Sequence, residues 1–313
     1  HSGKRKHCEI DFFGGEPLVN MPVVKYVTEY VRQKEKETGK VFKLTLTTNG
    51  VLLNDENIKW LNDNNISMVL SLDGRKEVHD YMRPDVGGHG TYDKVVKNFK
   101  KLVDSRDGNN YYLRGTFTNR NMDFSKDVLS MADEGFDILS VEPVVLKDSP
   151  YGFTKEDLPK IFAEYDKLTE FYLKRKKEGK GFFFFHFNID LEHGPCVAKR
   201  LSGCGAGHEY YAVAADGNMY PCHQFAGREN YMLGNVFEGV KNKELPKEFR
   251  KTHVLSKEKC RDCWAKFFCS GGCHANADLF HGNIHEPYEL GCELQKKRCE
   301  CAIVVKTAEK FGL

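Results

Sequence analysis

The sequence lacks the features that mark membrane proteins, secreted proteins and nucleic-acid-binding proteins. Its 313 residues contain no run of 18 or more uncharged apolar residues, the length that a membrane span requires. The amino end carries no secretory signal. The formal net charge is only +2, so no overall field attracts nucleic acid or acidic lipid. We therefore expect neither nucleic acid nor a membrane as a partner.

An initiator methionine and internal repeats are also absent. The chain opens with His1-Ser2-Gly3 and reaches an apolar segment, Ile10–Phe13, almost at once. A domain rarely begins so close to a buried strand, so we expect a segment upstream of His1 to be missing. No G-x-G-x-x-G follows a predicted strand, which disfavours a nucleotide-binding oxidoreductase.

Two hydrophobic periodicities alternate over the first 150 residues. Short β-rich segments predict strands, and longer segments with one apolar face predict helices. The predicted strands are Glu9–Phe13, Phe42–Thr47, Met68–Leu72, Tyr112–Thr118 and Ile138–Val145, and the predicted helices are Pro22–Glu37, Asp55–Asn62 (capped by Asp55), Tyr92–Ser105 and Ser125–Glu134. This alternation indicates βαβ units and a parallel sheet, open or closed into a barrel.

Functional residues of such sheets gather at the carboxyl ends of the strands. The unusual residues of the first half stand at those positions: Gly14-Gly15-Glu16-Pro17, Thr48-Asn49-Gly50, Asp73-Gly74 and Glu142-Pro143.

The rest of the chain changes character twice. A charged helix is predicted over Lys155–Glu178, and Phe182–Phe185 is predicted as a strand covered on both faces. Beyond Pro195 the pattern is irregular apart from one predicted hairpin, Tyr211–Ala214 with Met219–Pro221. A region this irregular requires metal to stabilise it. We therefore predict a first domain over residues 1–153, a bridging helix and linker over 154–194, and a cysteine-rich domain over 195–313.

Cysteines are concentrated in that last region. Ten of the 11 lie between Cys196 and Cys301, at metal-ligand spacings in a chain without an export signal, so metal binding is favoured over disulfides. Seven of them form the pattern Cys204-x12-Gly217-x4-Cys222, then Cys260-x2-Cys263-x5-Cys269-x3-Cys273, then Cys292. Thiolates two residues apart can hold one metal or cluster edge. The pattern predicts two iron–sulfur clusters, with a pair of structural zinc sites as the alternative.

Two four-coordinate centres need eight ligands, and this set supplies seven. Either Cys196 is the eighth ligand, or one centre is open and accepts a substrate thiol. Cys8, Cys299 and Cys301 are predicted to be buried structural thiols.

The seven-cysteine pattern resembles the SPASM domain, the C-terminal extension of many radical S-adenosylmethionine (SAM) enzymes that modify ribosomal peptides. The first half is similar to the catalytic domain of the same enzymes. The resemblance covers about residues 8–150 in the first half and 195–301 in the second. The motifs that carry this resemblance are Gly14-Gly15-Glu16-Pro17, Thr47-Thr48-Asn49-Gly50, Ser71-Leu72-Asp73-Gly74 and His79-Asp80-x2-Arg83. The resemblance implies an α/β fold: a partial (β/α)6 radical SAM barrel, its first strand missing, joined to an irregular SPASM domain.

Motifs in the second half are most similar to the maturases of six-cysteine SCIFF peptides, which form thioether crosslinks from cysteine sulfur to a carbon such as one of threonine. These motifs are Gly194-Pro195-Cys196, Gly203-Cys204-Gly205-Ala206-Gly207, Tyr220-Pro221-Cys222-His223-Gln224-Phe225 and Cys269-Ser270-Gly271-Gly272-Cys273. The anaerobic sulfatase-maturing branch is the rival. That branch places an aspartate base directly after the cysteine aligned with Cys222, and His223 stands there instead.

The resemblance also implies roles for single residues. Gly14, Gly15, Glu16, Asn49, Ser71 and Arg83 are the expected contacts to SAM, and His223 is a candidate base or a partner of the neighbouring ligand. Ordinary turn chemistry is the alternative for Asn49 and Ser71. The first auxiliary [4Fe–4S] cluster is assigned to Cys204, Cys222 and Cys273, and the second to Cys260, Cys263, Cys269 and Cys292.

One element of the family pattern is absent from these 313 residues, the Cys-x3-Cys-x2-Cys triad that binds the catalytic cluster. The family places it after the first barrel strand, so we expect the third [4Fe–4S] cluster to be held upstream of His1, with a catalytically dead paralogue as the alternative. The implied partners are a precursor peptide with a leader and a cysteine-rich core, and ferredoxin or flavodoxin as electron donor. The implied location is a reducing or anaerobic cytoplasm. A non-catalytic iron–sulfur or zinc module is the competing function.

Overall fold

The computed structural model describes residues 2–192 and 196–312. The chain divides into two compact units. Unit 1 comprises residues 1–144 and 174–185, and unit 2 comprises 145–173 and 186–313. The domain limits expected from the sequence, 1–153, 154–194 and 195–313, stay predictions. None of the described helices combines the length and the apolar character needed to cross a membrane.

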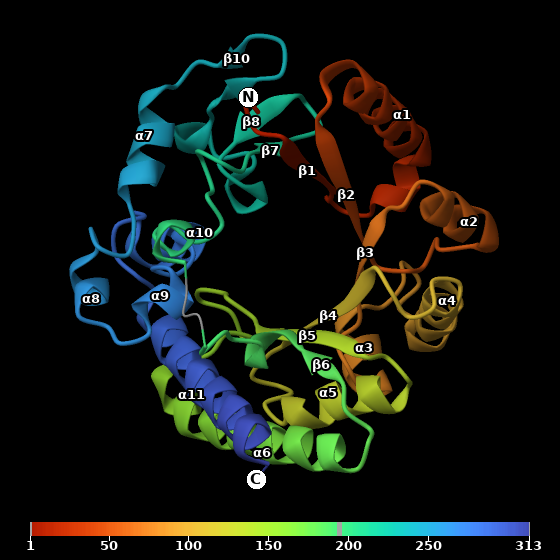
Figure 1. The fold of residues 1–313 in the computed structure, drawn as a ribbon, viewed down its shortest axis with the longest axis vertical. Helices are drawn as coiled ribbons and strands as arrows, with labels where there is room; N and C mark the ends of the chain where they lie inside the picture. Colours follow the sequence, from red (N-terminus) through yellow and green to blue (C-terminus); the bar gives the residue numbers. More distant parts are fainter. Residues whose placement is uncertain (1, 193–195, 313) are drawn as a thin grey trace. The chain divides into compact units, whose positions relative to one another are not determined.

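Unit 1 is built on a parallel sheet of six strands, each paired with the next along the chain. The strands are β1 (His7–Phe12), β2 (Val41–Thr48), β3 (Ser67–Ser71), β4 (Tyr111–Phe117), β5 (Ile138–Pro143) and β6 (Phe183–Phe184). Right-handed crossovers between sequential strands place all connecting helices on one face of a sheet. Figure 1 shows this arrangement for α1, α2, α4 and α5, and the predicted α/β fold with a parallel sheet is confirmed.

Four helices of unit 1 begin and end within one residue of the predicted positions: α1 (Met21–Thr38), α2 (Asp55–Asp63), α4 (Tyr92–Asp104) and α5 (Phe124–Asp133). The short helices η1 (Pro17–Asn20) and α3 (Lys76–Met82) were not predicted. The prediction that Asp55 caps α2 is wrong. Asn54 is the N-cap, because its extended backbone lets its side chain accept from the backbone N–H of Asn57.

The two faces of the sheet differ in chemistry. On the face that packs on the helices, Leu44, Leu46, Leu70, Leu113 and Leu139 are fully buried. The apolar stripe of α4, with Val95, Phe99 and Leu102 at helical spacing, is buried as well. The opposite face carries polar side chains, among them Asp11, Lys43, Thr45, Arg114 and Glu142, all of them exposed or half-buried. Burial alternates along β2 and β4, whereas β3 and β5 each bury three consecutive residues. The alternating strands leave polar side chains on the face opposite the helices.

The phenylalanine run near the end of unit 1 departs from its prediction. Phe182 and Phe184 are buried, whereas Phe183 and Phe185 are 40% and 60% exposed. The expectation of a strand covered on both faces is therefore wrong. The run forms only the two-residue β6, which pairs with β5 at the edge of the sheet, where one face stays open.

Unit 2 consists of two long helices and many short elements. Its bounds include η2 (Lys155–Asp157), α6 (Leu158–Lys177, whose last residues belong to unit 1), η3 (Phe185–Phe187), η4 (Val197–Arg200), η5 (His223–Phe225), η6 (Glu229–Tyr231), α7 (Glu244–Lys251), α8 (Glu258–Arg261), α9 (Lys266–Cys269), α10 (His274–His281) and α11 (Glu289–Phe311). Helices α6 and α11 lie side by side (Figure 1), and the Lys297 Nζ of α11 is 2.6 Å from an Asp166 carboxylate oxygen of α6.

A small antiparallel sheet in the order β10-β9-β8-β7 carries the predicted hairpin. The strands are β7 (Ala212–Val213), β8 (Asn218–Tyr220), β9 (Gly234–Asn235) and β10 (Gly239–Val240). Its core is aromatic, with Phe225, Tyr231 and Phe249 in mutual ring contact. With strands of two or three residues, this part of the chain forms a small core.

Candidate functional site

Glu16 joins the carboxyl ends of two strands of unit 1. It follows β1 as the N-cap of η1, where its Oε1 accepts from the backbone N–H of Leu18 at 3.1 Å. The same carboxylate accepts from Thr48 Oγ1 at 2.9 Å and from the backbone N–H of Asn49 at 2.7 Å, both at the end of β2. The turn after β1 is therefore held against the turn after β2 by charge-assisted hydrogen bonds.

The glycines before Glu16 leave open space above the turn. Gly14 has φ +133°, a conformation that a residue with a side chain rarely adopts. Apart from its chain neighbours, a Cβ at either Gly14 or Gly15 would meet no atom of the described residues within 4 Å. The backbone of the turn is thus open to a ligand, which fits the SAM contact that the sequence predicted there.

Asn49 and Ser71 lie at the same edge of the sheet. The Asn49 side-chain oxygen accepts from the backbone N–H of Val51 at 3.0 Å, and Ser71 is the half-buried last residue of β3. Asn49 therefore also makes the ordinary turn contact that was its alternative role. SAM contacts by these two residues stay predictions.

Arg83 is engaged within the protein. Its Nε and Nη2 donate to the buried Asp73 carboxylate at 2.6 and 3.2 Å. Asp73 also accepts from the backbone N–H of Thr116 at 2.9 Å, so it links the loop after β3 to β4. The Arg83 guanidinium is bidentate on Asp73 in the structure, and its predicted contact with SAM stays a prediction.

His79 completes this loop as a buried neutral imidazole. The backbone N–H of Asp73 points at Nδ1 from 3.4 Å, and Nε2 lies 3.1 Å from Thr91 Oγ1. Burial lowers the pKa of His79 to about 4. Asp80, the next residue, accepts from the backbone N–H of Tyr92 and so fixes the start of α4. The motif that suggested a ligand contact therefore holds the loop in place.

The polar face of the sheet contains residues that the motifs did not identify. Burial raises the pKa of Asp11, which interacts with Thr45 on the neighbouring strand. Burial also raises the pKa of Tyr112 on β4, with Asp11 and Glu142 adding to the effect. The signal was present in the alternation of apolar and polar residues along β1 and β2, and the parallel register places the neighbouring side chains of β4 and β5 on the same face.

Three cysteines of unit 2 come together from separate segments. Burial raises the pKa of Cys222 to about 11, and the thiols of Cys273 and Cys204 raise it further. Burial of the sulfur and the neighbouring Cys204 thiol also raise the pKa of Cys273. The backbone N–H groups of Gln224 and Phe225 face the Cys222 sulfur and lower its pKa. We call Cys204, Cys222 and Cys273 the three-thiol group.

Four other cysteines form a second cluster of thiols. Burial raises the pKa of Cys292 to about 12, and the thiols of Cys269, Cys260 and Cys263 contribute. Burial also raises the pKa of Cys260, where Cys269 and Cys263 act in the same direction. We call these four residues the four-thiol group. Cys260, Cys269 and Cys292 lie on α8, α9 and α11, and Cys263 follows α8. The assignment of the two sets to two clusters stays a prediction.

A buried cation lies among these thiols. Lys257 precedes α8, is 3% exposed and donates from Nζ to the carbonyl oxygen of Gly271 at 3.0 Å. Burial lowers its pKa, and Cys260, Cys269, Cys273 and Cys292 oppose that shift. No sequence motif pointed to this residue.

The remaining candidates have different surroundings. Cys196 and His223 are exposed, and the Gly194-Pro195 part of the motif before Cys196 lies outside the described residues. Cys299 and Cys301 are buried in α11, as predicted for structural thiols, and Cys8 is half-buried in β1. Cys299 also senses the charge of Cys269 and Cys263, so it lies near the four-thiol group.

Thiolates are the ligands of iron–sulfur clusters, so the chemistry of both groups fits such cofactors. Among the described residues, no three His, Cys, Asp or Glu side chains converge as they would on a single metal ion. A four-iron cluster is wider than one ion, and its ligands need not meet at one point.

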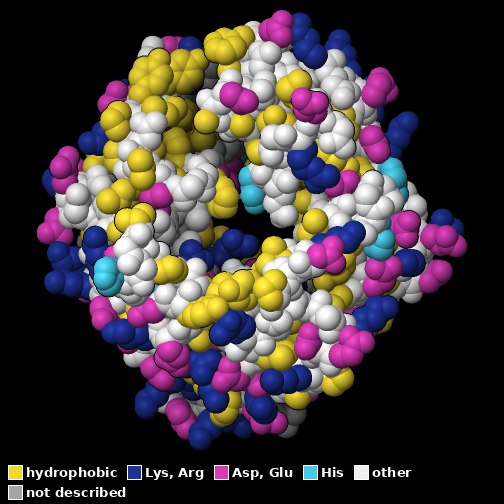
Figure 2. All heavy atoms as spheres, turned by 180° about the vertical axis from the view of Figure 1, so that it is seen from behind, with side chains coloured by type: hydrophobic (Ala, Val, Ile, Leu, Met, Phe, Trp, Pro, Cys, Tyr) yellow, Lys and Arg dark blue, Asp and Glu magenta, His cyan; other side chains and the backbone are white. Residues whose placement is uncertain are grey.

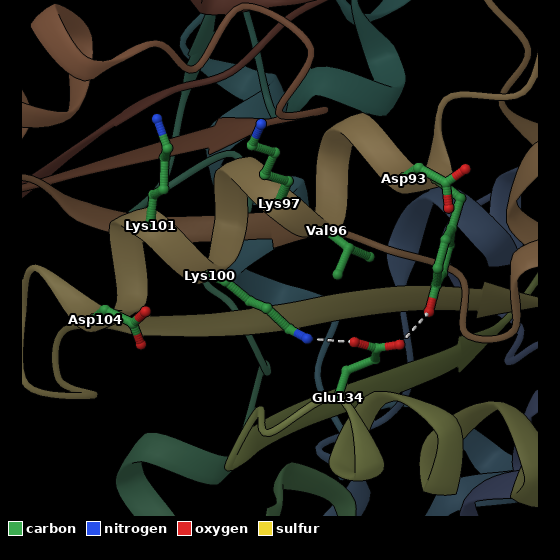
Figure 3. Close-up of a pocket in the computed structure, with 8 residues that line it drawn as sticks. Asp93, Val96, Lys97, Lys100, Lys101, Asp104 and Glu134 are labelled. Carbon is green, nitrogen blue, oxygen red and sulfur yellow. Dashed lines mark hydrogen bonds and ion pairs between the residues drawn. The ribbon is translucent and has the colours of Figure 1, made fainter.

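A shallow groove on unit 1 lies apart from all of these residues. It is lined by α4 and the end of α5, where Glu134 contacts Lys100 and accepts from Tyr92 Oη at 3.4 Å (Figure 3). None of the predicted SAM contacts or cysteines lines it. Acidic and basic side chains are also mixed over much of the face drawn in Figure 2, in keeping with the small net charge.

Comparison with protein families matches both halves of the chain. Residues 4–123 match the radical SAM superfamily, and residues 204–264 match SPASM, described as an iron–sulfur cluster-binding domain. The chain joins a radical SAM domain to a SPASM domain. Domains of these families bind SAM and [4Fe–4S] clusters. The part matched to SPASM includes Cys204, Cys222, Cys260 and Cys263.

Individual relatives cover most of the chain. A cysteine-type anaerobic sulfatase-maturating enzyme of Clostridium novyi is 25% identical over 295 residues, which are 87% of this chain and 75% of that protein. The radical SAM cyclopropyl synthase TigE of Paramaledivibacter caminithermalis is 21% identical, over 93% of this chain and 59% of that protein.

A solved structure has the same fold. Native anSMEcpe with bound AdoMet and Kp18Cys peptide superposes with a TM-score of 0.76 at 23% identity, over 99% of this chain and 87% of that one. This radical SAM SPASM-domain chain is therefore similar to sulfatase-maturating enzymes. The narrower similarity to SCIFF maturases stays a prediction.

Proposed function

We propose that this chain acts as a radical SAM maturase that forms thioether crosslinks in a ribosomally made, cysteine-rich peptide. The observation that carries the proposal is the division of seven thiols into a group of four and a group of three. Four thiolates complete one [4Fe–4S] cluster, whereas three leave one position of the other cluster without a protein thiolate.

The cofactors would supply the radical chemistry. When bound, SAM and its cluster would supply a radical able to remove a hydrogen atom from the peptide, and the auxiliary clusters would supply an electron acceptor and a binding position for a thiol. This chain's own residues would position the cofactor and the peptide and exclude water from them.

The SAM site is assigned to the carboxyl edge of the sheet in unit 1. Gly14 and Gly15 leave room for the ligand, and Glu16 holds the turn that would face its methionyl end. Asn49, Ser71 and Arg83 are the further proposed contacts, with Arg83 exchanging part of its interaction with Asp73 for the carboxylate of SAM.

Closing a carbon–sulfur bond from a C–H and an S–H group removes two hydrogens. The radical removes one as a hydrogen atom, and the thiol loses the other as a proton while one electron passes to an auxiliary cluster. His223 is exposed one residue beyond Cys222, a suitable position for accepting that proton. The partners would be a precursor peptide with a leader and ferredoxin or flavodoxin as electron donor. We place the enzyme in a reducing or anaerobic cytoplasm, because such clusters require low-potential electrons.

A decisive experiment uses the complete protein, reconstituted anaerobically with iron and sulfide. It is incubated with SAM, a reductant and a cysteine-rich precursor peptide, and the peptide is analysed by tandem mass spectrometry. We expect loss of two hydrogens per crosslink, retention of sulfur and protection of the crosslinked cysteine from alkylation. An unchanged peptide together with normal SAM cleavage would contradict the thioether assignment.

Maturation of a sulfatase cysteine is the second candidate. It is favoured by the similarity over 87% of the chain to the Clostridium novyi enzyme, and His223 in place of an aspartate counts against it. The same assay with a sulfatase-derived cysteine peptide separates the two, since only the matching substrate should be modified.

The open position has its own test. In the complete protein, Cys196→Ala should leave iron content unchanged, and a cysteine-containing peptide should perturb the cluster spectrum. Loss of about half of the eight irons expected of two clusters, with no response to peptide, would assign Cys196 as the missing ligand. Cys301→Ala is the matched control, because Cys301 is buried in α11 and contacts Asp166.

A further inference from the structure

Lys257 occupies a place that is unusual for a lysine. Its side chain is 3% exposed, whereas lysines are almost never fully buried without a partner. Its carbonyl oxygen accepts from the backbone N–H of Cys260 at 3.0 Å, which starts α8. Its Nζ donates to Gly271 O at 3.0 Å, and Gly271 lies midway between Cys269 and Cys273. One residue thus ties the start of one ligand segment, through its backbone carbonyl, to the middle of another, through its side chain.

Thiols of both groups lie within electrostatic range of Lys257. They are Cys260, Cys269 and Cys292 of the four-thiol group and Cys273 of the three-thiol group, and their ionised forms would favour the charged ammonium. The ammonium therefore lies within range of both groups at once.

A buried ammonium is stable only when anions and hydrogen-bond acceptors surround it. Gly271 O occupies one of its three donors. The groups that would supply negative charge are the cysteines, and they become thiolates when they bind iron. Loading of the clusters would therefore turn the surroundings of Lys257 from apolar thiols into a ring of anions.

We propose that Lys257 is a positioning residue shared by the two auxiliary clusters, which keeps the Cys269–Cys273 turn in place and raises the reduction potential of both. This inference rests on the proposed presence of both clusters. A fixed cation stabilises the additional negative charge of a reduced cluster, and net charge near the site is one of the factors that set such potentials. Because it is buried, solvent does not screen this cation as it screens surface lysines.

The test measures the midpoint potentials of the auxiliary clusters by an EPR-monitored redox titration of the complete, reconstituted protein. Lys257→Met removes the charge with little change of length. Lys257→Gln removes the charge but keeps a donor for Gly271 O, and Lys257→Arg keeps the charge. Lys259→Met is the matched control, since Lys259 lies on the same short helix but is 55% exposed and paired with Glu289.

We expect the ratio of reduced to oxidised cluster, at the wild-type midpoint, to fall about tenfold in Lys257→Met and Lys257→Gln. That change corresponds to a potential lower by about 59 mV for a one-electron couple. Lys257→Arg keeps the charge, so its midpoint potentials should lie near the wild-type values. The midpoint potentials of Lys259→Met should also stay close to wild type.

The other possible outcomes also support or overturn the proposal. Full iron content with unchanged potentials in both neutral variants overturns the proposal. If both neutral variants lose iron while Lys257→Arg retains it, the need for a cation at this position is supported. If all three variants lose iron alike, shape rather than charge matters, and the proposal is wrong. Absence of iron and sulfide from the wild-type protein would instead contradict the proposed function.

Discussion

Burial keeps the imidazole of His79 neutral, and the contacts of this side chain lie within the protein. Its imidazole is 1% exposed and lies between the backbone of Asp73 and the hydroxyl of Thr91. Taking a charged imidazole out of water is costly, so burial lowers its pKa from 6.5 to about 4. Between these two pH values, the unfolded chain binds a proton at this residue that the folded chain does not.

The consequence is a pH dependence of stability with a defined sign. The contribution of neutral His79 is fully present above pH 6.5 and is lost as the pH falls toward 4. The free energy of unfolding should fall by up to about 1.4 kcal/mol per pH unit in that window. Urea unfolding of the wild type and of His79→Gln at several pH values isolates the effect, because the other titrating groups are common to both. An identical slope in the variant would contradict the assigned pKa.

Glu16 is the other residue whose role extends beyond its own turn. Its carboxylate accepts three hydrogen bonds from two strand ends, and charged hydrogen bonds contribute about 1.5–3 kcal/mol each. Glu16→Ala should loosen the turn and weaken SAM binding at least about tenfold, which equals only about 1.4 kcal/mol. Equilibrium binding of SAM and the yield of 5′-deoxyadenosine in the complete enzyme measure the change. Glu56→Ala is the control, since that side chain is 82% exposed; equal values for both variants would count against this SAM site.

At the scale of elements, one ion pair joins the loop after β3 to α5 within unit 1. Arg75 Nε donates to Asp127 Oδ1 at 2.7 Å, and Arg75 Nη2 donates to Asp123 at 2.7 Å. The Asp127 side chain is fully buried and also accepts from Asn121 at 3.0 Å. The Arg75 guanidinium therefore neutralises a charge that has no access to solvent.

Removing the cation should be costly because the anion stays behind. We expect Arg75→Met to lower the free energy of unfolding by about 3–5 kcal/mol, the range for breaking a buried ion pair on one side. Lys126→Met is the matched control, because Lys126 lies on α5 next to Asp127. Its pair with Asp123 is largely exposed, so its loss should cost less than about 1 kcal/mol. Denaturant unfolding compares the two, and equal small effects would show that Asp127 is neutral in the fold.

At the scale of the whole molecule, the two units differ in what stabilises them. Unit 1 buries a continuous apolar layer between its sheet and helices. Unit 2 relies on elements of two to four residues around its cysteines, such as α8 and α9. Small cores of this kind gain stability from bound metal, since binding free energy becomes folding free energy.

Cluster removal should therefore act on one unit. After acid or chelator treatment of the complete protein, hydrogen exchange of amides between Cys260 and Cys292 should rise sharply. Amides of β2 to β4 should keep their protection, because no cluster ligand lies in them. Mass spectrometry of exchanged peptides provides the measurement. Unchanged exchange around the cysteines would contradict a structural role for the clusters.

Much of the fold follows from local pattern. β1 to β5 and the helices α1, α2, α4 and α5 were predicted within two residues, because period-2 and period-3.6 hydrophobicity depend only on neighbouring residues. The short helices η1 and α3 were not predicted. The cysteine spacing predicted metal binding for the same reason. The errors lie where context decides, as at Asn54, which competes with Asp55 for the cap, and at Phe183, which is exposed because β6 ends the sheet.

The sequence by itself determined that parallel strands end in glycine- and asparagine-rich turns and that seven thiols lie at ligand spacing. The spacing alone does not say how those thiols are divided; the family resemblance implied the sets of three and four, and the electrostatic interactions of the sulfurs in the folded chain follow the same sets. Cys269 and Cys273 are four residues apart, yet they belong to different groups. Ser270, Gly271 and Gly272 between them all have positive φ, which turns the chain sharply and separates the two sulfurs. The burial of Lys257 against the middle of that turn is equally a tertiary event, since no local pattern requires a lysine to face thiols from distant segments.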